Sequence, residues 1–182
     1  MDKRPPTILS FAVRASRYGY AVFAGPEKLL DWGAGEIVSH ETGNAVGVRR
    51  AEFLFGHFRP DVVILSRSPR VLSGNYPRAG DLIQSITRES ALGDARLVSL
   101  DWEAITSVFA ASGPSTRYEI ASALARTFPD LHWKLPPKPK STDREPHILI
   151  AFDAVAGAVA GSFPDVSHPL LVSEGDPTPI AL

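Results

Sequence analysis

Cysteine is absent from this chain of 182 residues. Its absence excludes disulfides, thiolate catalysis and zinc sites built from cysteine ligands. An excess of charge is also missing, because 19 Lys and Arg residues are balanced by 20 Asp and Glu residues, for a net charge of −1. Domains that bind nucleic acid are often clearly basic, so any such binding here must rely on a local cluster of cations.

Long hydrophobic runs are missing as well. The longest apolar stretch, residues 148–160, contains Asp153 and several Ala and Gly residues, and it is too short and too weakly apolar to span a bilayer. Residues 1–6 contain charges and two prolines where a secretory signal would have an apolar segment. We therefore expect a cytoplasmic protein with no membrane contact.

The hydrophobic residues, 44% of the chain, suffice to bury the core of one domain. Their periodicity predicts an α/β fold in which three antiparallel strands and two more form a mixed five-stranded sheet with helices on both faces. We expect one domain at 1–163 and a proline-rich, flexible tail at 164–182. The expected strands are 7–14, 18–24, 28–38, 61–66 and 95–100, and the expected helices are 43–58, 79–91, 102–111, 116–128 and 145–161.

Two capping boxes mark the starts of the last two expected helices. Thr116 and Glu119 form the first, and Thr142 and Glu145 form the second. Between these helices, residues 134–144 are basic and rich in proline, which predicts an extended loop.

The two strands expected at 7–14 and 18–24 resemble the opening of the RuvC-type Holliday-junction resolvases. In that family a first strand ends in an Asp-Pro-Gly-Ser turn, and a Gly-Tyr-Gly-Val strand follows. Here Ile8-Leu9-Ser10-Phe11-Ala12 and Gly19-Tyr20 occupy the equivalent places without a gap.

Four later segments resemble, in order, the third strand, the fourth strand, the Gly-Ser-x-x-Lys stretch that opens a late helix, and the Asp-Ala-Leu-Ala segment of the final helix. They are residues 29–37, 59–65, 113–117 and 152–156. The resemblance covers residues 7–162. It implies an RNase H-like fold and a homodimer, because a four-way junction offers two symmetric strands.

Members of that family cut branched DNA with two divalent metal ions held at four acidic positions, since paired ions need clustered carboxylates. Carried over by position, the resemblance places three of these acids on Ala12, Ser66 and Ile150. Only the fourth remains an acid, as Asp153. The resemblance thus implies a degenerate site with no metal cofactor.

Asp153 lies in an apolar segment, where an unpaired carboxylate would be costly. It is either a former metal ligand put to another use or an aspartate held by polar partners for structural reasons. Arg14 and Arg17 follow the first strand, and Arg67 and Arg70 follow the fourth. We hypothesise that one of them, Arg14 above all, pairs with Asp153 and replaces the lost metal charge. The alternative is that these arginines are solvated loop charges.

Three functions stay open at this point. The first is a catalytically inactive domain that binds branched DNA or a partner protein, with nucleic acid contacted by Arg14, Arg17, Arg67, Arg70 and Arg117. The second is an active junction endonuclease that uses magnesium or manganese, with acids supplied by Glu103, Asp143 or Glu145. The third is an assembly subunit that uses only the dimerising helices of the fold.

Overall fold

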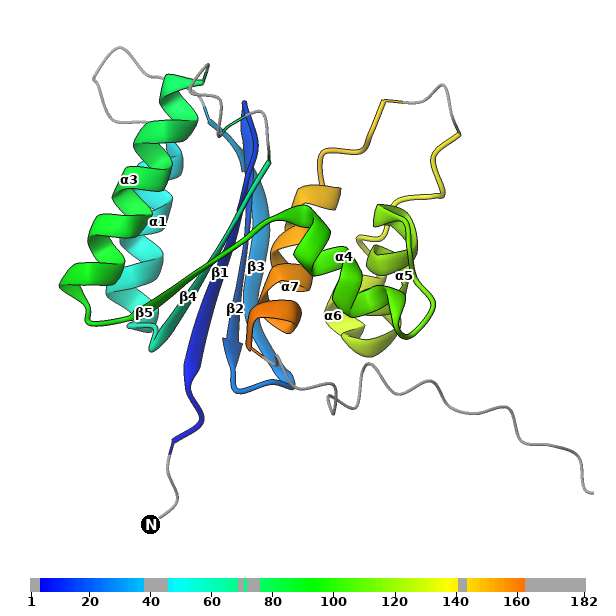
Figure 1. The fold of residues 1–182 in the computed structure, drawn as a ribbon, viewed down its shortest axis with the longest axis horizontal. Coiled ribbons are helices and arrows are strands. Elements are labelled where there is room, and N and C mark those ends of the chain that lie inside the picture. Colours follow the sequence, from blue (N-terminus) through cyan, green and yellow to red (C-terminus); the bar gives the residue numbers. More distant parts are fainter. Residues whose placement is uncertain (1–3, 38–45, 69–70, 72–75, 141–143, 163–182) are drawn as a thin grey trace, which may run out of the picture.

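Two layers of helices enclose a central sheet (Figure 1). The structure is a computed structural model, and it describes residues 4–37, 46–68, 71, 76–140 and 144–162. The expected tail at 164–182 lies outside the described residues.

The sheet contains the five predicted strands, each within two residues of its expected bounds: β1 (Thr7–Val13), β2 (Arg17–Ala24), β3 (Lys28–Glu36), β4 (Val62–Arg67) and β5 (Arg96–Leu100). Their order is β3-β2-β1-β4-β5. The first three strands pair antiparallel, whereas β4 and β5 run parallel to β1. The predicted mixed sheet is confirmed.

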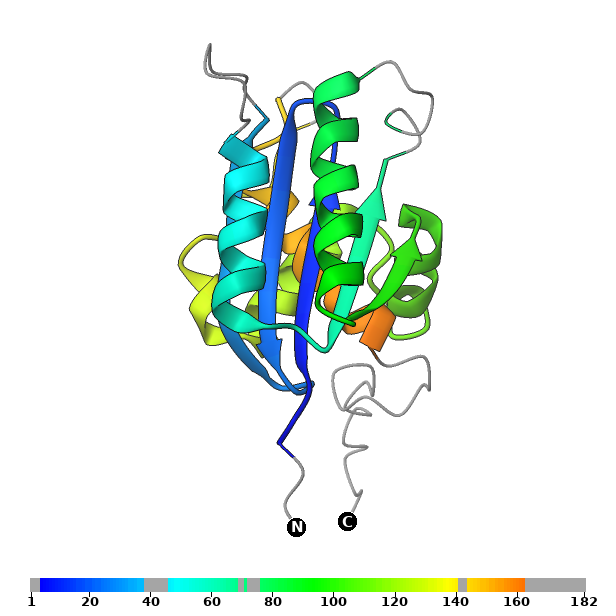
Figure 2. The same ribbon diagram turned by 90° about the vertical axis from the view of Figure 1, so that its left-hand side faces the viewer.

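Helices cover both faces of this sheet. One face carries α1 (Val46–Phe58) and α3 (Pro77–Leu92), which lie in front of the strands in Figure 2. The other face carries α4 (Trp102–Ala110), α5 (Arg117–Thr127), α6 (Pro129–His132) and α7 (Leu149–Ser162). The sequence did not predict α6, a single turn that starts at a proline directly after α5.

Every residue of β1 is buried because both faces of the sheet are covered. Leu9 and Phe11 pack in the core beneath α1 and α3, and Ile8 and Ala12 pack in the core that contains α7. Ala12 therefore points to the α7 side of the sheet.

The chain folds α7 into the centre of the molecule, where residues 149–160 are all buried. Apart from Asp153, the buried residues of this helix are apolar or glycine on every side, since the sheet covers one side and α4 and α5 cover the other. It packs against β2 so closely that a side chain at Gly19 would collide with the backbone carbonyl of Ile150. Within the part of the chain that the structure describes, no helix is long and apolar enough to cross a membrane.

The start of α7 corrects one sequence prediction. The helix begins at Leu149, four residues after the predicted start at Glu145. Thr142 of the expected capping box lies outside the described residues. Pro146 disfavours helical backbone at Glu145, and the Glu145 carboxylate pairs with two arginines. The other predicted box, Thr116 with Glu119, is present at the start of α5.

Candidate nucleic-acid interface

A pocket of about 530 Å³ opens where β1 and β4 end. Ala12 and Ser66 lie opposite each other in the parallel register of these two strands, and both line the pocket together with Asp153 of α7. Ligands of open α/β sheets bind at the carboxyl ends of the strands, which is where this pocket lies.

Asp153 is held at the inner wall of the pocket with only 4% of its side chain exposed. Arg117 binds it through two parallel contacts, from Nε to Oδ1 at 2.7 Å and from Nη2 to Oδ2 at 2.5 Å. Arg14 donates a further hydrogen bond to Oδ2 at 3.1 Å. The predicted pairing of Arg14 with Asp153 is present, but the closer partner is Arg117.

Arg117 reaches Asp153 because the capping box fixes where α5 begins. The Thr116 hydroxyl accepts a hydrogen bond from the backbone N–H of Glu119, and Arg117 is the first residue of the helix. The side chain of Arg117 is 15% exposed, so its contact with Asp153 is largely shielded from water.

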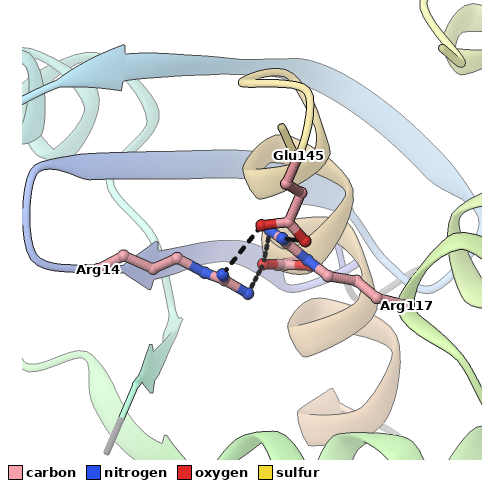
Figure 3. A network of polar contacts seen from close by, with 4 residues as sticks. Arg14, Arg117 and Glu145 are labelled. Atoms are coloured by element: carbon pink, nitrogen blue, oxygen red, sulfur yellow. Dashed lines mark hydrogen bonds and ion pairs between the residues drawn. The ribbon is translucent and has the colours of Figure 1, made fainter. Parts of the chain in front are cut away.

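Arg14 comes to the same carboxylate from the opposite side. Its backbone N–H donates to the carbonyl of Arg17, which closes the tight turn between β1 and β2. Figure 3 shows Arg14 extending from this turn toward Arg117, with Glu145 lying against both guanidinium groups.

Glu145 completes a square of alternating charges. Its carboxylate pairs with Nη1 of Arg14 at 3.3 Å and with Nη1 of Arg117. Each arginine therefore bridges the two acids, and the four charges cancel. Unlike Asp153, Glu145 is 46% exposed, and it lies in the irregular segment 144–148.

Burial and pairing act against each other on the pKa values of this cluster. Desolvation raises the pKa of Asp153, and the hydrogen bonds and charge of Arg117 oppose that rise. Desolvation lowers the pKa of Arg117, but the hydrogen bonds and charges of Asp153 and Glu145 together outweigh it and raise the pKa overall.

The residues at this pocket do not fit a pair of divalent metal ions. Ala12 has no donor atom, Ile150 is buried in the core away from the pocket, and Ser66 offers one hydroxyl. Both carboxylates are paired with guanidinium groups, whose charge would repel a divalent cation. Among the described residues, no three His, Asp or Glu side chains gather as a metal site. The donor set supports no metal-dependent step here.

The remaining sequence candidates divide into three groups. Arg17 and Arg67 are half-buried, line the pocket and make no side-chain hydrogen bond or ion pair within the described chain. Arg70 and Asp143 lie outside the described residues. Glu103 follows the cap of α4 and does not line the pocket. Of the described acids that an active endonuclease could use in place of the lost ones, Glu145 therefore lies beside Asp153 and Glu103 does not.

Sequence reasoning assigned Arg117 to nucleic acid, and Glu145 to a helix cap or, in the active-nuclease alternative, to a metal site. It missed the contact between these two residues. The available signal for Arg117 is its place at the lysine position of the Gly-Ser-x-x-Lys stretch, next to a capping box. Trp102 packs partly against the core and also lines the pocket.

The fold is similar to those of solved Holliday-junction resolvases. Thermus thermophilus RuvC in complex with a Holliday junction substrate aligns with a TM-score of 0.61 and 15% identity, over 87% of this chain and 94% of that one. The yeast mitochondrial Holliday junction resolvase Ydc2 aligns with a TM-score of 0.60 and 12% identity, over 86% of this chain and 78% of that one.

No protein-family model and no curated protein matches the chain. At identities this low, the structural likeness establishes the fold. The chain has the RuvC-type, RNase H-like fold that the sequence resemblance implies.

Proposed function

We propose that this protein binds branched nucleic acid at the pocket between β1, β4 and α7, and that it does not cleave the bound strand by a two-metal mechanism. One observation carries the proposal. Of the four positions that are acidic in the resolvases, Asp153 alone is still an acid here, and two arginines already neutralise its charge. The positive charges of Arg14 and Arg117 thus balance the Asp153 carboxylate, as the charges of metal ions would.

Binding is supported by the arginines that the cluster leaves available. Arg17 lies at the start of β2 and Arg67 at the end of β4, the two strands that flank β1. Both line the pocket and have no acidic partner among the described residues. Such cations attract phosphate groups, even though the whole chain has a net charge of −1. The structures of similar fold include RuvC in complex with a Holliday junction, which makes a branched DNA the first substrate to test.

We also propose that the protein acts as a homodimer. A four-way junction is two-fold symmetric, and a symmetric ligand favours a pair of identical sites. The third alternative, an assembly subunit without nucleic-acid binding, makes no use of Arg17 and Arg67, for which the described residues provide no acidic partner.

One assay tests binding and cleavage together. The full chain is mixed with a four-way DNA junction in EDTA, in magnesium and in manganese, and both the mobility shift and the product strands are recorded. We expect a shift in all three conditions and no products in any of them. The absence of a shift at low salt would overturn the binding proposal.

Cleavage that requires a metal ion would overturn the inactive part of the proposal. In that case Glu145 and Asp153 would be the metal ligands, and both Glu145→Gln and Asp153→Asn would abolish the products. Glu145 is half exposed, so its variant tests this alternative without disturbing the core.

The salt dependence of binding locates the interface. We expect Arg17→Gln and Arg67→Gln each to weaken junction binding and to reduce the slope of log affinity against log salt by about one unit. Arg96→Gln is the matched control, because Arg96 is an exposed arginine at the opposite end of the parallel strands. An equal effect of all three variants would place the interface elsewhere.

A further inference from the structure

Glu145 and Asp153 contact the same two arginines but differ in how firmly the fold holds them. Asp153 is 4% exposed and belongs to a buried helix. Glu145 is 46% exposed and lies in a segment with no regular structure, four residues before α7 begins. Glu145 can therefore leave the cluster without any change in the packing of α7.

The departure of Glu145 would leave an anion site ready for use. Nη1 of Arg14 and Nη1 of Arg117 both point at the Glu145 carboxylate, and Nη2 of each remains on Asp153. Asp153 neutralises only one of the two guanidinium charges. The site would then carry one uncompensated positive charge, with two donors directed at the place of the Glu145 carboxylate, which lines the pocket.

We propose that Glu145 occupies the position of a phosphodiester and that a phosphate of the bound nucleic acid displaces it. The inference rests on the proposed function, and it names the group that the pocket recognises. A phosphodiester carries one negative charge, as the Glu145 carboxylate does, and arginine forks bind phosphate and carboxylate oxygens with similar geometry. Asp153 acts as a positioning residue that holds both guanidinium groups in place.

This exchange makes Glu145 an inhibitory contact. Before the phosphate can bind, the two ion pairs of Glu145 must break, and the wild-type affinity is lowered by their free energy. Because these pairs are partly exposed, the penalty is modest.

The first experiment removes the charge of Glu145 and keeps its size. We expect Glu145→Gln to bind a four-way junction roughly fivefold more tightly than wild type at low salt. The slope of log affinity against log salt should stay close to that of wild type, because the same phosphate is neutralised in both proteins. Glu27→Gln is the matched control, since it removes the same charge from the exposed turn between β2 and β3, and we expect it to leave both values unchanged.

A double-mutant cycle ties the gain to the arginines. In an Arg14→Gln background, Asp153 keeps its two contacts with Arg117. We expect Glu145→Gln to improve junction binding less in that background than in wild type. An equal gain in affinity in both backgrounds would contradict the proposal that Glu145 and a phosphate occupy the same position beside Arg14.

Pyrophosphate separates this inference from the proposed function. We expect pyrophosphate to raise the Tm of Glu145→Gln more than that of wild type, relative to sodium chloride at equal ionic strength. If the junction does not bind but this difference appears, the anion site stands and nucleic-acid binding fails. If the junction binds but neither affinity nor the pyrophosphate response changes in Glu145→Gln, nucleic-acid binding stands and the inhibitory role of Glu145 fails.

Discussion

Asp153 lies on a helix whose other residues from 149 to 160 are all apolar or glycine. In these surroundings its negative charge requires positively charged partners. A carboxylate so deeply buried stays ionised only beside compensating charges, and two of its oxygen contacts come from one arginine fork. The ion pairs thus hold α5, α7 and the turn after β1 together at the mouth of the pocket.

The variant Asp153→Asn tests this structural role. It removes the negative charge and leaves Arg117, 15% exposed, with Glu145 as its remaining acidic partner. We expect the free energy of unfolding to fall by about 3 kcal/mol, because a largely buried guanidinium loses its main counter-charge. Urea denaturation measures the change. Asp130→Asn, an exposed aspartate in α6, is the control, and an equal loss in both variants would contradict the argument.

At the scale of secondary-structure elements, the close approach of α7 to β2 positions Asp153. No side chain fits between Gly19 and the backbone of Ile150. The distance between helix and sheet is therefore set by the absence of a Cβ atom, and it also sets how far Asp153 lies from the two arginines.

We expect Gly19→Ala to destabilise the protein by about 3 kcal/mol, because the new methyl group meets backbone atoms that cannot move without shifting α7. Thermal or urea denaturation measures the loss. In Gly56→Ala the added methyl group meets nothing within 4 Å on α1, so that variant should be neutral or slightly stabilised. A neutral Gly19→Ala would show that α7 moves freely.

The start of α5 has a pH dependence of its own. Hydrogen bonds from the backbone N–H groups of Thr116 and Ser115, and from their side chains, lower the pKa of Glu119 from 4.5 to about 2. The folded state thus keeps this carboxylate ionised where the unfolded chain is already protonated. Its stabilising effect is complete above pH 4.5 and is lost as the pH falls toward 2.

The variant Glu119→Gln isolates that charge. We expect it to be less stable than wild type above pH 4.5, and the difference in unfolding free energy should shrink toward zero near pH 2. Urea denaturation at a series of pH values gives the difference directly. A difference that stays constant over this range would contradict the role of the charge.

At the scale of the whole molecule, the net charge of −1 does not favour nucleic-acid binding, whereas the fold brings arginines together at one pocket. The chain is nearly neutral, yet the pocket at the end of the central strands carries Arg17 and Arg67 beside the charge-balanced cluster of Arg14, Arg117, Glu145 and Asp153. If the protein binds nucleic acid as proposed, we expect the binding to occur at these two arginines and to depend strongly on salt.

The proposed homodimer has a measurable consequence at this scale. We expect sedimentation equilibrium to give twice the mass of one chain, and one dimer to saturate one four-way junction. Saturation by a single chain per junction would contradict the symmetric arrangement.

The sequence by itself determined the order of the strands along the chain and their bounds to within two residues. Four of them, β1, β2, β4 and β5, are short, mainly apolar runs, and β3 shows an alternation of apolar residues. It also determined that Ala12 and Ser66 carry no carboxylate. Only the tertiary structure decided which cations meet Asp153. Arg117 lies 36 residues away in the chain and Arg14 lies 139 residues away, and their approach depends on how α5 and the β1–β2 turn pack against α7. Glu145 joined them because Pro146 keeps it out of the helix, which leaves its side chain directed at the arginines.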